Sequence, residues 1–60
     1  MTDFEFMKAM LVRKYGKNNV SVFEYGDGTK SILLDSEEVE FYFFADDTFD
    51  EVINTKCSLF

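Results

Sequence analysis

The sequence predicts one small α+β domain over residues 1–60, in which an N-terminal helix packs on a three-stranded antiparallel meander and a short C-terminal helix follows. Two patterns support this fold class. Apolar residues recur at helical spacing in the first fifteen positions, whereas residues 20–44 contain three runs rich in β-branched and aromatic side chains. The connections between these runs are too short for parallel crossovers, so neighbouring strands must be antiparallel.

Residues 2–16 have the pattern of a helix with a signal at each end. Thr2 and Glu5 match the capping box, in which each side chain bonds the backbone N–H of the other residue, and Gly16 favours termination. The stripe predicted to face the core, at spacings of three and four, consists of Phe4, Met7, Leu11 and Tyr15. Because Phe6, Met10 and Val12 lie beside this stripe, the apolar arc is wider than one sheet face usually covers.

The three predicted strands are residues 20–25, 30–34 and 39–44, joined by a Gly-Asp-Gly turn at 26–28 and a second turn at 35–38. Alternation along each strand divides the side chains between two faces. The wholly apolar face, which we expect to receive the helix, consists of Val20, Val22, Ile32, Leu34, Val39, Phe41 and Phe43. The mixed face consists of Ser21, Phe23, Tyr25, Leu33, Glu40, Tyr42 and Phe44.

Residues 48–55 are predicted to form the C-terminal helix. Thr48 and Glu51 repeat the spacing of a capping box. The apolar residues that follow at helical spacing are Phe49, Val52 and Ile53. Residues 53–59 also alternate between apolar and polar side chains, so the alternative for the tail is one turn of helix followed by a fourth strand.

The chain lacks histidine, which is the commonest general base and a common metal ligand. It contains no histidine and one cysteine, Cys57, so an internal disulfide and a structural zinc site are excluded. The acids from Asp46 onward do not match an EF-hand, because Glu51 and Cys57 stand where its Gly and bidentate Glu are required. Adjacent carboxylates holding a divalent ion loosely are the alternative that this pattern leaves open. We therefore expect no enzyme activity, no cofactor and no specific metal site.

Negative charge is concentrated in the second half of the chain, and the net charge is −6. Residues 1–30 carry five Lys or Arg and four Asp or Glu, whereas residues 31–60 carry one Lys and eight Asp or Glu. This distribution argues against direct binding of nucleic acid and against an anionic membrane surface, which both require a basic footprint. Because the N-terminus is acidic and no long apolar run follows, we expect a cytoplasmic location.

Seven acids flank or lie within the third predicted strand, and they have two interpretations. These candidate partner-binding acids are Glu37, Glu38, Glu40, Asp46, Asp47, Asp50 and Glu51. In the structural interpretation, some cap the predicted C-terminal helix and the others keep an aromatic-rich chain soluble. In the recognition interpretation, fixed carboxylates occupy a site built for phosphates, because Arg and Lys bind both groups through similar charge-assisted hydrogen bonds.

The mixed sheet face also presents a cluster of aromatic side chains. The candidates for partner binding or for a dimer contact are Phe23, Tyr25, Tyr42 and Phe44. An exposed cluster of this kind usually marks an interface. The alternative is that the C-terminal segment folds over this face and completes the core.

In composition, the chain resembles the small acidic proteins encoded by phages and mobile elements, some of which block host nucleic-acid enzymes by imitating DNA. The resemblance covers no defined motif. It implies a binding module that inhibits or modulates a basic, nucleic-acid-binding protein. The alternative is a homodimeric structural or accessory module that associates through its aromatic sheet face, with the acids serving only solubility.

Overall fold

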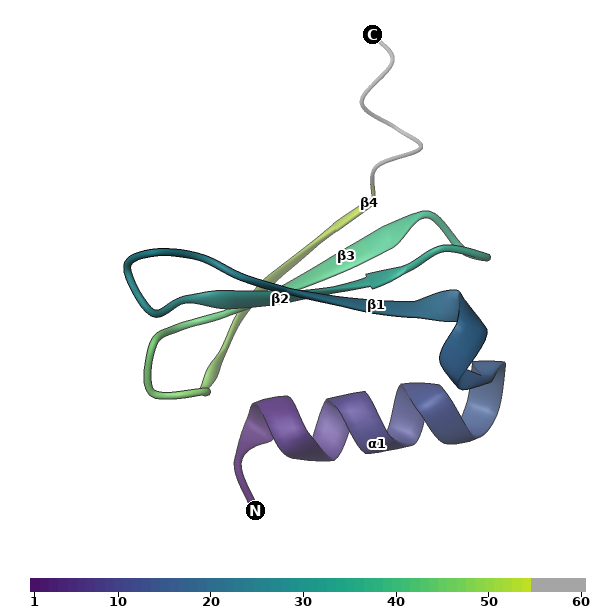
Figure 1. Ribbon diagram of the computed structural model, residues 1–60, viewed down its shortest axis with the longest axis horizontal. Coiled ribbons are helices and arrows are strands. Elements are labelled where there is room, and N and C mark those ends of the chain that lie inside the picture. The colour runs from purple at the N-terminus through teal and green to yellow at the C-terminus, as the bar shows by residue number, and fades with distance from the viewer. Residues whose placement is uncertain (55–60) are drawn as a thin grey trace, which may run out of the picture.

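The computed structural model describes residues 1–54, which form one helix layer and one sheet layer (Figure 1). The elements in chain order are α1 (Asp3–Tyr15), the 3-10 helix η1 (Lys17–Asn19), β1 (Val20–Glu24), β2 (Lys30–Leu34), β3 (Val39–Phe43) and β4 (Phe49–Asn54). The strands form one antiparallel sheet in the order β1-β2-β3-β4, and α1 runs along one of its faces. The predicted α+β class, the N-terminal helix and the antiparallel meander are confirmed.

Both predicted end signals of α1 are present in the structure. The side chain of Thr2 accepts a hydrogen bond from the N–H of Glu5 at 3.1 Å, and the N–H of Thr2 donates to Oε1 of Glu5 at 3.3 Å. Gly16 ends the helix with a φ of 90°, and its N–H donates to the carbonyl of Val12 at 2.8 Å. A positive φ is accessible to glycine without steric cost, so the sequence fixes the end of α1 at this position.

The hydrophobic core lies between α1 and the predicted apolar face of the sheet. Its buried residues are Phe4, Leu11, Ile32, Leu34 and Phe43, against which Met7, Tyr15, Val20, Val22 and Phe41 pack. The ring of Phe43 meets the ring of Phe4 edge to face, with 5.3 Å between their centroids. The predicted division of the sheet into two faces is therefore confirmed for the side that receives the helix.

The predicted C-terminal helix is wrong, because residues 49–54 form strand β4 at one edge of the described sheet. Thr48 caps no helix, since its N–H and its hydroxyl both donate to Oδ1 of Asp46, at 3.1 and 2.6 Å. These bonds close a tight turn that reverses the chain into β4. A short polar side chain that bonds its own backbone two residues on favours such a turn over a helix start.

A β-bulge explains why β4 has the sequence spacing of a helix. Phe49 pairs with Phe43, and Val52 pairs with Phe41, so both lie opposite residues that face α1. Asp50 is the extra residue between them, where the register shifts. The alternative for the tail, one turn of helix followed by a fourth strand, is confirmed only for the existence of that strand, because β4 already begins at Phe49 and no helical turn precedes it. The part of this alternative beyond residue 54 lies outside the described residues.

The turns β1–β2 and β3–β4 have the same construction. In the β1–β2 turn, Oδ1 of Asp27 accepts hydrogen bonds from the N–H and the hydroxyl of Thr29, at 3.0 and 2.6 Å. In the β3–β4 turn, Oδ1 of Asp46 accepts the same two bonds from Thr48. In each turn the third residue has a positive φ, 94° at Gly28 and 72° at the corresponding aspartate. The two turns lie at the same end of the sheet (Figure 1). The shared pattern, an aromatic residue followed by x-Asp-x-Thr, recurs at a spacing of nineteen residues.

Candidate functional site

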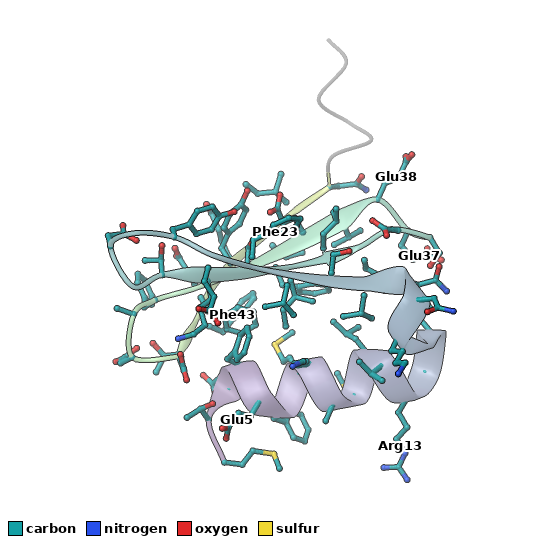
Figure 2. The ribbon with its side chains drawn as sticks, viewed as in Figure 1. Glu5, Arg13, Phe23, Glu37, Glu38 and Phe43 are labelled. Carbon is teal, nitrogen blue, oxygen red and sulfur yellow. The ribbon has the colours of Figure 1, made fainter. Side chains whose placement is uncertain are left out.

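The side of the sheet turned away from α1, here called the outer face, is the candidate site. Alternation along the paired strands assigns to it Ser21, Phe23, Ser31, Leu33, Glu40, Tyr42, Glu51 and Ile53. Figure 2 shows Phe23 on this side and Phe43 on the side toward α1. The predicted mixed face is thus the face that no described element covers.

A chain of hydrogen bonds crosses the centre of the outer face from β1 to β3. The hydroxyl of Tyr25, the residue after β1, bonds Oγ of Ser31 at 2.9 Å. Ser31 donates onward to Oε2 of Glu40 at 2.9 Å, and Tyr42 donates to Oε1 of the same carboxylate at 2.9 Å. Because the single hydroxyl proton of Ser31 points to Glu40, Tyr25 is the donor to Ser31. Both oxygens of Glu40 are therefore held in place.

The network changes the acidity of one of its members. The hydrogen bond to Glu40, with partial burial and the nearby carboxylate charges as further causes, raises the pKa of Tyr42 to about 12. Ser31 is fully buried although it lies on the outer face, because the side chains around it exclude water. A buried hydroxyl needs a partner, and Glu40 supplies it.

Half-exposed rings and an aliphatic side chain surround this network. The exposed fraction is 45% for Phe23, 43% for Tyr25 and 40% for Ile53. Among the described strand residues that project to the outer face, none is Lys or Arg, and Glu51 adds a second, exposed carboxylate opposite Tyr42. Within residues 1–54, the strand positions of the outer face thus combine exposed apolar surface with negative charge and no cation.

The seven predicted partner-binding acids do not form one continuous patch. Glu37 and Glu38 lie in the β2–β3 turn, and Figure 2 shows both at that end of the sheet. Asp46 and Asp47 lie in the β3–β4 turn, and the five residues of β3 place about 17 Å between the two turns. Asp50 is at the bulge of β4. The two acids that the fold brings together on the outer face are Glu40 and Glu51.

The acids of the β3–β4 turn hold that turn to the rest of the fold. Hydrogen bonds from Thr48 lower the pKa of Asp46. Asp47 forms an ion pair with Lys30 at 2.5 Å, and this bond raises the pKa of Lys30. The carbonyl of Asp47 also accepts from the N–H of Phe4 at 3.0 Å, which joins the turn to the start of α1. These two acids thus have structural partners within the chain.

The remaining predicted candidate, Phe44, follows β3 and is 49% exposed. The residue of the candidate site that the sequence did not reveal is Ser31. The sequence shows it only as a single polar residue within a predicted strand. The strand register, which pairs Ser31 with Tyr42, is needed to see that Glu40 lies beside it.

Within residues 1–54, no three metal-ligating side chains lie close enough together to hold an ion, and no helix is long and apolar enough to cross a membrane. The sequence matches no protein-family model, and neither a curated protein nor a solved structure is significantly similar to it. The proposal below therefore rests on the residues of the outer face.

Proposed function

We propose that this chain is a small acidic protein-binding module that inhibits or modulates a basic partner, and that the outer face is its docking surface. The observation that supports the proposal is the arrangement of half-exposed Phe23, Tyr25 and Ile53 around the fixed carboxylate of Glu40. No described strand residue that projects to this face is Lys or Arg. Buried aromatic anchors supply most of the binding energy in many protein interfaces.

A partner arginine fits this arrangement chemically. Its guanidinium group stacks on an aromatic ring and pairs with a carboxylate in the same contact, which a compact ammonium group does less well. Glu40 is already held by Ser31 and Tyr42, so its side chain loses little conformational freedom on binding. The exposed carboxylate of Glu51 provides a second point of attachment.

The acids away from the outer face contribute through the field of the whole molecule. Residues 18–54 carry ten Asp or Glu and one Lys, so a basic partner is attracted before contact is made. Nucleic-acid-binding proteins are the class that commonly present Arg and Lys on one surface. We therefore propose that the partner is a basic protein of this class, with Glu37, Glu38, Asp46, Asp47 and Asp50 attracting it from the periphery.

Matched pairs of variants test the proposal in affinity capture at low and at high salt. Phe23→Ser changes the outer face, and Phe6→Ser makes the same change on the helix side, where Phe6 is also exposed. Glu51→Lys and Glu37→Lys alter the net charge equally, at the outer face and at a distant turn. The outer-face variants should lose the captured partner, whereas Phe6→Ser should retain it and Glu37→Lys should weaken capture only slightly, through the change in net charge.

Two results would count against the proposal. If Glu37→Lys and Glu51→Lys reduced the amount of captured partner equally, capture would depend on the net charge alone and not on the position of the acid. Capture that is unaffected by Phe23→Ser would mean that the aromatic side chains make no contact.

A second candidate function is self-association through the outer face, which the exposure of Phe23 and Tyr25 favours. It requires Glu40 and Glu51 of two copies to approach each other, and like charges in an interface oppose association. Sedimentation of the parent and of Phe23→Glu distinguishes the two candidates. A dimer that is lost in Phe23→Glu and persists in high salt would support self-association through this face.

A further inference from the structure

The side of α1 turned away from the sheet exposes apolar residues that the core does not use. The exposed fraction is 57% for Phe6 and 45% for Met10. Two shallow grooves meet on this side, and both are lined by Ala9 and Arg13. Phe6 and Met10 line one groove, and Val12 lines the other. The wide apolar arc seen in the sequence thus leaves apolar surface exposed on the helix.

Two of the three charged residues that line these grooves, Glu5 and Arg13, lie symmetrically about the middle of α1, whereas the third, Lys8, has no charged counterpart. Ala9, the smallest side chain there, is at the centre, and Glu5 and Arg13 are each four residues away from it, in opposite directions. Figure 2 shows Glu5 and Arg13 toward opposite ends of α1, both directed away from the sheet. A helix with this pattern is complementary to an antiparallel copy of itself.

We infer that a second copy of this chain docks on this side of α1, with the two helices antiparallel and crossing at Ala9. In a two-fold arrangement, positions equally far from Ala9 face each other, so Glu5 of each copy meets Arg13 of the other. The same rule brings Phe6 of each copy opposite Val12 of the other. Apolar surface is therefore buried on both sides of the crossing. A small residue at the crossing allows the two helices to approach closely.

The charge pattern selects a second copy over the basic partner of the outer face. A basic partner would leave Arg13 facing like charge, whereas an antiparallel second copy offers Glu5 to Arg13 and Arg13 to Glu5. The outer face and this side of α1 lie on opposite sides of the sheet, so both can be occupied at once. The inference does not depend on the proposed function, although such a dimer would present two outer faces.

The experiment is sedimentation equilibrium of the full chain under reducing conditions, with charge-exchange variants. A contact between two 13-residue helices is at the small end of protein interfaces, so the concentrations should run from about 10 μM to about 1 mM. The parent should change from one chain to two over this range. Glu5→Arg and Arg13→Glu should each remain monomeric, because each places like charges opposite each other.

An equimolar mixture of Glu5→Arg and Arg13→Glu provides the decisive measurement. Each copy then offers the charge that the other needs, so the mixture should form a heterodimer, although neither variant associates alone. Because the same two proteins are used, restored association also shows that both are folded. Ala9→Glu, which places two carboxylates at the crossing, should abolish the parent dimer, whereas Phe23→Glu on the outer face should preserve it.

Three results would overturn the inference. They are a parent that stays monomeric at the highest concentration, a mixture that stays monomeric, and a dimer that survives Ala9→Glu but not Phe23→Glu. The last result would assign self-association to the outer face instead.

Discussion

The hydroxyl of Tyr42 donates a 2.9 Å hydrogen bond to Oε1 of Glu40, two residues earlier on the same strand. The two side chains share the outer face because strand residues two apart point the same way. A hydroxyl that donates to a carboxylate resists deprotonation, since a phenolate would lose the bond and meet a like charge. This relationship links the acidity of one tyrosine to the carboxylate at the centre of the candidate site.

The first prediction concerns the titration of Tyr42. Its pKa of about 12 should fall toward the ordinary value of 10.0 in Glu40→Gln, because the charged acceptor is removed. Phenolate absorbance measures the change, and subtracting the titration of Tyr42→Phe isolates this residue from the two other tyrosines. An unchanged curve in Glu40→Gln would show that the hydrogen bond does not control the acidity.

The same shift has a consequence for stability at high pH. The pKa of Tyr42 is higher in the folded than in the unfolded chain, so its contribution is fully present below pH 10 and is lost as the pH rises toward 12. The free energy of unfolding of the parent should therefore fall more steeply across this interval than that of Tyr42→Phe. Urea denaturation at several pH values between these limits measures both slopes.

The second prediction concerns Ser31, the buried link between Tyr25 and Glu40. Ser31→Ala removes the partner of one carboxylate oxygen and of one hydroxyl, and we expect it to lower the free energy of unfolding by about 1–2 kcal/mol. Ser36→Ala, in an exposed turn, is the matched control and should change it by less than about 0.5 kcal/mol. Urea denaturation of both variants checks the difference, and equal effects would contradict the importance of the network.

The two faces of the sheet could be predicted from the sequence because their cause is local. Alternation in β1, β2 and β3 needs no knowledge of the partner strand, and the helix stripe that includes Phe4 and Leu11 selects the apolar face. Strand β4 could not be predicted in the same way. Its bulge at Asp50 breaks the alternation and leaves Phe49 and Val52 three residues apart, as in a helix.

The candidate site was only partly predictable, because its parts meet through the strand register. Alternation alone predicts that Phe23, Tyr25 and Tyr42 share one face, but the bond between Ser31 and Glu40 depends on how β2 pairs with β3. The separation of the acids follows from the meander itself. Successive turns of a meander lie at opposite ends of the sheet, so the turn at 35–38 cannot adjoin the turn at 45–48.

The third prediction concerns the acid sensitivity of the two similar turns. Hydrogen bonds from Thr29 and Thr48 lower the pKa values of Asp27 and Asp46 below the ordinary 3.8. The stability that these carboxylates contribute is therefore present above about pH 4 and is lost as the pH falls through their lowered values. The double variant Asp27→Asn/Asp46→Asn should lose less stability than the parent over this interval.

Thermal unfolding between neutral pH and pH 3 measures this difference. Asparagine retains an oxygen acceptor but does not titrate, so the double variant should remain folded at neutral pH. The corresponding double alanine variant, which loses the acceptors, should be less stable than the parent at neutral pH. Parallel acid transitions in the parent and in the asparagine variant would show that these two groups do not determine the sensitivity.

The fourth prediction compares two glycines in the β1–β2 turn. Gly28 has a φ of 94°, and a Cβ there would lie 3.2 Å from Cβ of Ala45 in the neighbouring turn. Gly28→Ala should therefore lower the free energy of unfolding by about 1–2 kcal/mol, because the left-handed backbone and the close contact both penalise a side chain. Gly26→Ala is the matched control, since its added methyl meets no atom within 4 Å and its φ is not in the left-handed region. It should leave the urea midpoint unchanged or raise it slightly by restricting the unfolded chain. Equal destabilisation by both substitutions would mean that the turn does not have the positive φ and the neighbour described above.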